Sequence, residues 1–137
     1  MKTSNRNQHL SRGQTMVEFA MVASVFLLLL MGIVQMGRAV YSYNFVSYAA
    51  RDATRYAIVH GSKSLTPAAT SDVQNFVVKE AHGFDTSQFT VTTTWSPNNN
   101  PGSFVNVVVK YNFSLSIPFF GKVNLPLTST SQMVISQ

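Results

Sequence analysis

The chain has 137 residues, of which 45% are hydrophobic and 11% are charged, and it contains no cysteine. The apolar share argues against a disordered chain and is typical of a membrane-attached protein, while the lack of cysteine excludes disulfides, thiolate metal sites and a cysteine nucleophile. The formal charge is +5, but Lys2, Arg6 and Arg12 lie in the first 13 residues and the remaining +2 is scattered, which argues against a nucleic-acid-binding patch.

An uncharged, strongly apolar run lies between Glu18 and Arg38. At ~1.5 Å of rise per residue, this run forms a helix about 28 Å long, close to the ~30 Å hydrocarbon thickness of a bilayer. It therefore predicts one membrane-spanning helix over residues 14–37. Because positive residues that flank a span stay in the cytoplasm, the basic N-terminus is expected inside and the chain after Arg38 outside.

Glu18 lies at the start of this run, where a carboxylate is costly unless a positive group meets it. If the chain is cut after Gly13, the new amine on Gln14 lies four residues before Glu18, on the same helix face. The N-terminal end of a helix also favours a negative side chain. Glu18 is therefore expected to compensate an N-terminal amine, its own or a neighbour's; the alternative is a plain glutamate at the membrane boundary.

The same residues carry a family resemblance. A short basic leader, Gly13, four residues and then Glu18-Phe19 opening a hydrophobic helix resembles the processing site of type IV prepilins. The chain then continues with YSYNFVSYAARDATRYAIVHG, TVTTTWSPNNNPGSFVNVVVKY and LTSTSQMVIS. With these stretches it resembles, along nearly its whole length, the TadE-like minor pseudopilins of tight-adherence (Flp) type IV pilus systems.

The resemblance implies a structural protein rather than an enzyme, with no cofactor. It implies a leader over residues 1–13 that a prepilin peptidase removes between Gly13 and Gln14, and an assembly helix over residues 14–37 that includes Glu18 and Phe19. Residues 38–137 would form an exported pilin-like domain of a single-pass inner-membrane protein. The implied partners are the membrane, other pilins or pseudopilins, and an assembly platform with its ATPase; no nucleic acid and no small-molecule substrate are expected.

Two other classes of protein stay open. The first is an uncleaved, signal-anchored extracytoplasmic receptor or binding domain that uses its sheet face. The second is a secreted protein cut by ordinary signal peptidase after Ala39, which is a poor match because the apolar run is long and Arg38 is adjacent. N-terminal sequencing separates the three, giving Gln14, Met1 or Val40.

Beyond the span the pattern stays helical. No proline interrupts residues 14–61, which predicts one continuous helix that ends near Gly61. Residues spaced by three and four predict the face that packs on protein: Ala39, Tyr43, Val46, Ala50, Ala53 and Ala57. A second helix is predicted after a loop over residues 62–71, with Ser71 or Asp72 as its N-cap and Gly83 at its end; Pro67 could alternatively open it.

Alternation with a period of two predicts strands over residues 89–96, 105–117 and 123–136. A three-stranded antiparallel meander covered by the two helices, an α+β fold, is the simplest arrangement. Pro126 marks an edge strand or a strand start. The Thr- and Ser-rich face is expected to be solvated, with a surface for adhesion or subunit packing as the alternative.

Few side chains suit catalysis. His60 and His82 each precede a glycine at a predicted helix end, where an imidazole can meet the last carbonyls; catalysis is the alternative. No phosphate loop, dinucleotide fingerprint, zinc spacing or nucleophile elbow is present in the sequence, so no catalytic, cofactor-binding or metal-ligating residue is predicted. Four aromatic residues just beyond Arg38 suit either an interfacial belt or a helix-to-sheet core: Tyr41, Tyr43, Phe45 and Tyr48.

Overall fold

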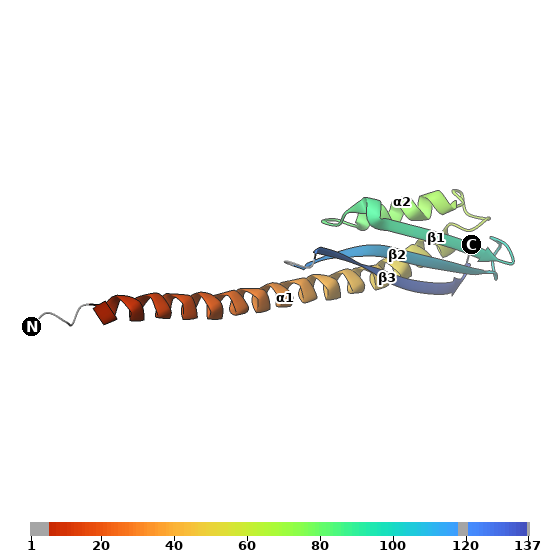
Figure 1. Ribbon diagram of the computed structural model, residues 1–137. Helices are drawn as coiled ribbons and strands as arrows, with labels where there is room; N and C mark the ends of the chain where they lie inside the picture. The colour runs from red at the N-terminus through yellow and green to blue at the C-terminus, as the bar shows by residue number, and fades with distance from the viewer. Residues whose placement is uncertain (1–5, 118–120, 137) are drawn as a thin grey trace, which may run out of the picture. The chain divides into compact units, whose positions relative to one another are not determined.

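A computed structural model describes residues 6–117 and 121–136, and the chain divides into two compact units, Met1–Gly37 and Arg38–Gln137. The elements are helix α1 (Arg6–Val59), helix α2 (Thr70–Glu80), a single 3₁₀ turn η1 (Thr86–Gln88), and strands β1 (Phe89–Ser96), β2 (Phe104–Ile117) and β3 (Gly121–Val134) (Figure 1). The strands form an antiparallel sheet of order β1-β2-β3. The predicted α+β fold with a long first helix, a short second helix and a three-stranded meander is confirmed.

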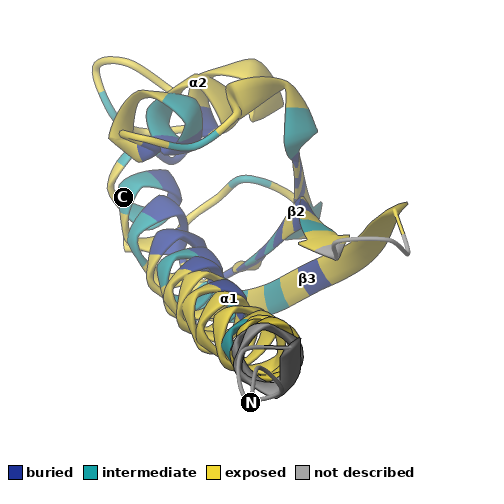
Figure 2. Cartoon of the chain, turned by 60° about the vertical axis from the view of Figure 1, so that its left-hand side comes forward, coloured by how far each residue is buried: buried dark blue, intermediate teal, exposed yellow. Residues whose placement is uncertain are grey.

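From Arg38 onward α1 packs on the sheet through small residues. Val46, Ala50, Ala53 and Ala57 are fully buried, and Figure 2 shows α1 and α2 on one side of the sheet with their buried faces toward it. Alanine side chains allow a helix backbone to approach a sheet closely, and each buried methyl also removes apolar area from water. The predicted helix stripe is therefore correct at these positions.

The stripe is wrong at Tyr43, whose side chain is 54% exposed. The buried position in that turn is Ser42, which the periodicity places elsewhere. Its hydroxyl donates to the Arg38 carbonyl at 2.9 Å, so a small polar side chain is buried with its hydrogen bond made inside the helix. A tyrosine ring at position 43 lies at the edge of the covered face and remains in solvent.

Aromatic rings join the helices to the sheet in one part of the core. Phe84, which precedes η1, has its ring centroid 4.5 Å from that of Phe45 on α1 and 5.4 Å from that of Tyr111 on β2. Phe89 on β1 lies 4.5 Å from Tyr111 in the same measure. Offset and edge-to-face pairs at these separations add stabilisation beyond the buried area. Phe45 is thus part of the core, whereas Tyr41 stacks on Phe84 with its own ring mostly exposed.

The start of α2 differs from the prediction. The N-cap is Ala69, not Ser71 or Asp72, and α2 begins at Thr70. Asp72 occupies the third helical position, from which its carboxylate accepts a hydrogen bond from the Ala69 N–H at 2.9 Å. A carboxylate in the first turn satisfies a free backbone donor and meets the positive end of the helix dipole, so its capping role is kept from a different position.

Both histidines lie at helix ends, as predicted. His60 Nδ1 is 2.9 Å from the Tyr56 carbonyl oxygen, and His82 Nδ1 is 3.2 Å from that of Glu80. These contacts satisfy carbonyls that have no partner within the last helical turn. The capping interpretation of both side chains is confirmed by these distances.

The strands keep the predicted alternation within one or two residues at each end. In β1, Thr90, Thr92 and Thr94 are exposed, which agrees with a solvated Thr-rich face. Pro126 lies within β3, which is an edge strand of the sheet, so its missing N–H interrupts no ladder on the open side.

We expect Ala53→Leu to destabilise the fold. Ala53 is fully buried between α1 and the sheet, and a leucine there overpacks the contact at a cost of about 1–3 kcal/mol. Thermal unfolding of the full chain in detergent measures the change. Asn44→Leu, on the exposed face of the same helix, is the control and should leave the midpoint nearly unchanged; equal effects would contradict the packing of α1 on the sheet.

A second prediction concerns pH. The hydroxyl and the backbone N–H of Ser87 donate to Asp85 at 2.6 and 3.1 Å and lower the pKa of its carboxyl below 3.8. Because the folded pKa is depressed, this cap stabilises the fold at neutral pH and is lost as pH falls through the folded value. Asp85→Ala should therefore lower the melting temperature at neutral pH but not in strong acid, and an equal loss at both pH values would rule out the carboxylate as the cause.

Candidate functional site

The residues predicted for processing and assembly all lie in the first unit, within α1. Gly13, Gln14, Glu18 and Phe19 are exposed, Phe19 to 73%. The segment is regular α-helix, so Gln14 and Glu18, one turn apart, share a face as their spacing required. An added Cβ at Gly13 meets no atom within 4 Å, so nothing in the described fold requires glycine at this position.

The electrostatic state of Glu18 depends on the bond before Gln14. In the uncut chain the Gln14 nitrogen is an uncharged amide inside α1 and offers the carboxylate no positive charge. Hydrolysis of the Gly13–Gln14 bond would turn that nitrogen into an amine, which carries a positive charge at neutral pH. The helix therefore holds an acid one turn from a group whose charge proteolysis can create.

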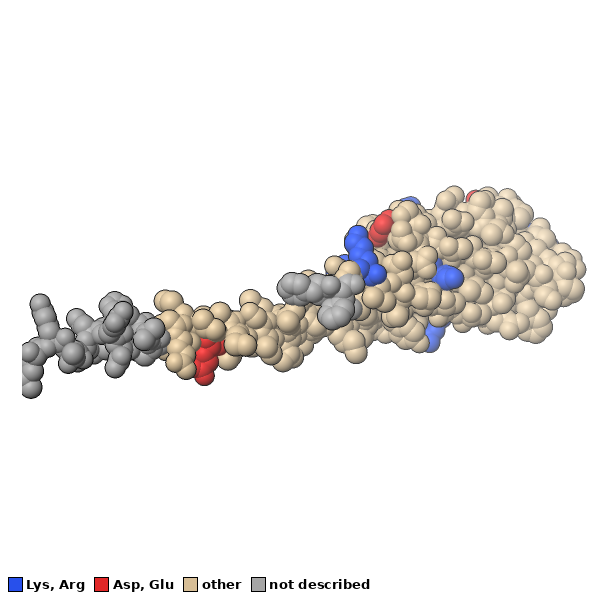
Figure 3. Space-filling view, viewed as in Figure 1, with Lys and Arg blue, Asp and Glu red and all other residues tan. Residues whose placement is uncertain are grey.

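The apolar run after Glu18 has no protein cover in the described structure. The most apolar window of 18 residues in α1 has a mean hydropathy of 2.5, and none of it is buried. Phe19, Leu27 and Ile33 are exposed to 73%, 63% and 62%. On the face seen in Figure 3 this helix shows an almost uncharged surface.

Polar groups within the run can be satisfied inside the helix. The Ser24 hydroxyl donates to the Ala20 carbonyl at 2.7 Å, so it needs no water. A spanning helix must meet its polar groups internally, because the hydrocarbon offers no hydrogen-bonding partner. Length, hydropathy, exposure and the Ser24 bond together fit a helix that crosses a membrane once.

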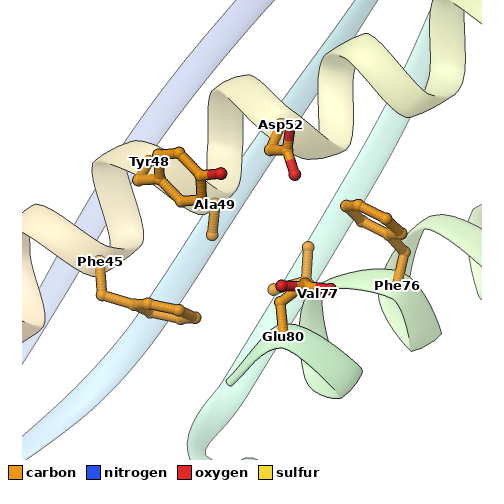
Figure 4. A pocket seen from close by; sticks show the side chains of 7 residues that line it. All are labelled: Phe45, Tyr48, Ala49, Asp52, Phe76, Val77 and Glu80. Carbon is orange, nitrogen blue, oxygen red and sulfur yellow. The ribbon is translucent and has the colours of Figure 1, made fainter. Parts of the chain in front are cut away.

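The second unit has a small open depression between α1 and α2 (Figure 4). Phe45, Tyr48 and Ala49 lie along one side, Phe76 and Val77 along the other, and two carboxylates border it, Asp52 from α1 and Glu80 from α2. Its empty space, open solvent included, is about 200 Å³. That is less than the ~300–1,000 Å³ of ordinary small-molecule sites, so its shape does not suggest a ligand pocket.

Metal ligands are not grouped in the part of the chain that the structure describes. Across residues 6–117 and 121–136, no three His, Asp or Glu side chains lie together in a way that could hold a metal ion. Several of the acids and histidines instead serve helix and turn ends, as Asp72, Asp85 and His60 do.

Two interactions in the second unit were missed by sequence reasoning. The Arg38 guanidinium carbon lies 5.9 Å from the centroid of the Phe113 ring, which joins the start of this part of α1 to β2. The Thr54 hydroxyl lies 2.7 Å from the Ala50 carbonyl oxygen and 3.4 Å from that of Ser131 on β3. The contacts to Phe113 and Ser131 join residues far apart in the sequence, and none of these residues stands in a motif that would have indicated the contact.

Comparison with known families gives one match. The model of the TadE-like protein family matches residues 13–55, a segment that begins at Gly13 and includes Glu18, the apolar run and most of the helix packed on the sheet. Searches among curated proteins and among solved structures found no significant match. The matched segment confirms the resemblance seen in the sequence and indicates a role related to the Tad pilus: over residues 13–55, this chain is a TadE-like protein.

Proposed function

We propose that the chain is a minor pseudopilin, a structural subunit that is processed after Gly13 and incorporated into, or supports, a tight-adherence pilus. The observation that carries the proposal is the placement of Glu18 on an exposed, TadE-like apolar helix, one turn after Gln14. An anchor needs only the apolar run. An acid at its mouth adds a cost that makes sense when a positive partner is supplied.

Processing is the first step of this proposal. The cations of residues 1–13 hold the leader on the cytoplasmic side, where a prepilin peptidase hydrolyses the Gly13–Gln14 bond. Water supplies the OH of the new Gly13 carboxylate and a hydrogen of the new Gln14 amine. The product is a mature chain whose N-terminal charge is opposite to that of Glu18.

Assembly is the second step. The exposed apolar surface of α1 exchanges lipid for the helices of neighbouring pilins or pseudopilins, and Glu18 compensates a Gln14 amine in its own or an adjacent subunit. Each Leu, Ile, Phe or Val in such a helix favours the membrane by ~0.3–0.6 kcal/mol, so extraction of the whole run is not spontaneous. An assembly platform with an ATPase supplies the free energy, and residues 38–137 form the domain carried outside the cytoplasm.

The processing step predicts that Gly13→Leu retains the leader. The structure has open space at this position, so the variant should fold and insert normally while the peptidase no longer accepts the side chain before the cut. Intact-mass measurement of the membrane-extracted protein should show the added mass of residues 1–13. Gly37→Leu, with equally open surroundings in the same helix, is the control and should be cut; normal cutting of Gly13→Leu would contradict the assigned site.

The assembly step predicts that Glu18→Gln is inserted and cut but not assembled. Loss of one partner of a charge pair removed from water costs about 3–5 kcal/mol, so surface pili should fall by well over tenfold. Quantitative immunoblotting of sheared pili, together with N-terminal sequencing of the membrane fraction, measures both steps. Glu80→Gln removes the same charge from α2 and should assemble normally; full piliation by the Glu18 variant would refute the pairing.

A further inference from the structure

The free end of the β2–β3 hairpin carries an apolar patch that no described part of the chain covers. Along this face of the sheet Phe113 and Leu127 are buried. The next residues toward the hairpin end pair as Phe113↔Leu125 and Leu115↔Val123. Leu125 is 47% exposed and Val123 44% exposed, although alternation puts both on the face that elsewhere forms the core.

Contacts within the second unit fix the direction in which this hairpin runs beside α1. Near the far end, the Ser136 N–H donates to the Ile58 carbonyl at 3.3 Å. Further back, the Thr54 hydroxyl lies 3.4 Å from the Ser131 carbonyl oxygen. At the start, Arg38 lies over Phe113, the cross-strand partner of Leu125. A decrease in residue number along α1 is therefore matched by a decrease along β3.

Arg38 relates this direction to the membrane. It is bonded directly to Gly37, the last residue of the uncharged run, so when that run spans the bilayer Arg38 stands at the boundary between headgroups and water. Phe113 and Leu125 then lie at the same level. Val123 is two strand residues further on, about 6.6 Å closer to the lipid, or deeper within its boundary.

Charge also favours lipid as the occupant. Lys122, next to Val123, is exposed, and the sequence from Asn112 to Leu125 contains no Asp or Glu. A basic residue beside aliphatic ones suits the headgroup and acyl boundary, where anionic headgroups attract the cation and the acyl chains accept the aliphatic side chains. We propose that Leu115, Val123 and Leu125, the hairpin patch, enter this boundary of the membrane and form a second membrane contact in addition to the span.

The patch would have a mechanical consequence for the membrane-resident subunit. With only α1 in the bilayer, the second unit would be free to rotate about the helix axis. A second contact, held to this part of α1 by Arg38 and Phe113, fixes that rotation and presents one chosen face of the sheet and of α2 to neighbouring subunits. The inference rests on the proposed span, and its test is designed to separate the two.

The chain has no cysteine, so single-cysteine variants can be labelled without altering other residues. Full-length Leu125→Cys and Val123→Cys, each carrying an environment-sensitive fluorophore, are reconstituted in vesicles of phosphatidylethanolamine and phosphatidylglycerol. Quenching by nitroxide-labelled lipid and by aqueous iodide is measured for each. Thr130→Cys, exposed on β3 about 16 Å from Leu125, is the control in water, and Leu28→Cys is the control within the span.

We expect several-fold stronger quenching by nitroxide lipid, and weaker quenching by iodide, at Leu125 and Val123 than at Thr130. Quenching at Leu125 and Val123 equal to that at Thr130 would overturn the membrane contact. So would protection from both quenchers, which would show that a second protein copy covers the patch. If the Leu28 label itself escapes lipid quenching, the proposed span fails; if Leu28 is quenched and the hairpin labels are not, only the hairpin inference fails.

Discussion

The uncovered apolar surface of α1 between Phe19 and Gly37 is the constraint on which the rest of the structure depends. Large aliphatic and aromatic side chains on every face of a helix, with none of its most apolar window buried, are stable only where water is replaced by lipid or by other apolar helices. The internally bonded Ser24 obeys this constraint. Glu18 departs from it, which is why that residue carries the most functional information in this segment.

The same helix meets a different environment after Arg38, and its side chains change accordingly. Leucine, methionine and phenylalanine dominate where the helix is exposed, because large side chains present the most apolar area to a fluid solvent. Alanines such as Ala50, Ala53 and Ala57 take over where the helix packs on a rigid sheet, because there the backbone must come close. One continuous element thus combines an apolar surface suited to lipid with a small-residue face suited to protein, and the change occurs at the first charged residue after the run.

Function in this protein follows from placement rather than from a chemical centre. The TadE-like segment begins at Gly13 and extends into the helix that packs on the sheet, so the matched region covers both environments of α1. Acids and histidines in the second unit close helix and turn ends. An assembly subunit requires a surface that can leave lipid for neighbouring helices and a folded domain joined to it, and the two units of this chain provide each of these.

The sequence by itself determined the helix, the strands, the meander and the TadE-like segment, because hydropathy period and turn residues are local properties that the backbone reads directly. Tertiary structure decided which side of each borderline position is covered. Ser42 rather than Tyr43 is buried because the sheet covers only part of the helix circumference, and Ala69 rather than Ser71 caps α2 because the helix begins earlier than the sequence predicts. The contact between Arg38 and Phe113 joins residues from opposite ends of the second unit's sequence, and the exposure of Leu125 depends on where α1 stops covering the sheet. Such contacts arise from the packing of distant elements, which no local pattern encodes.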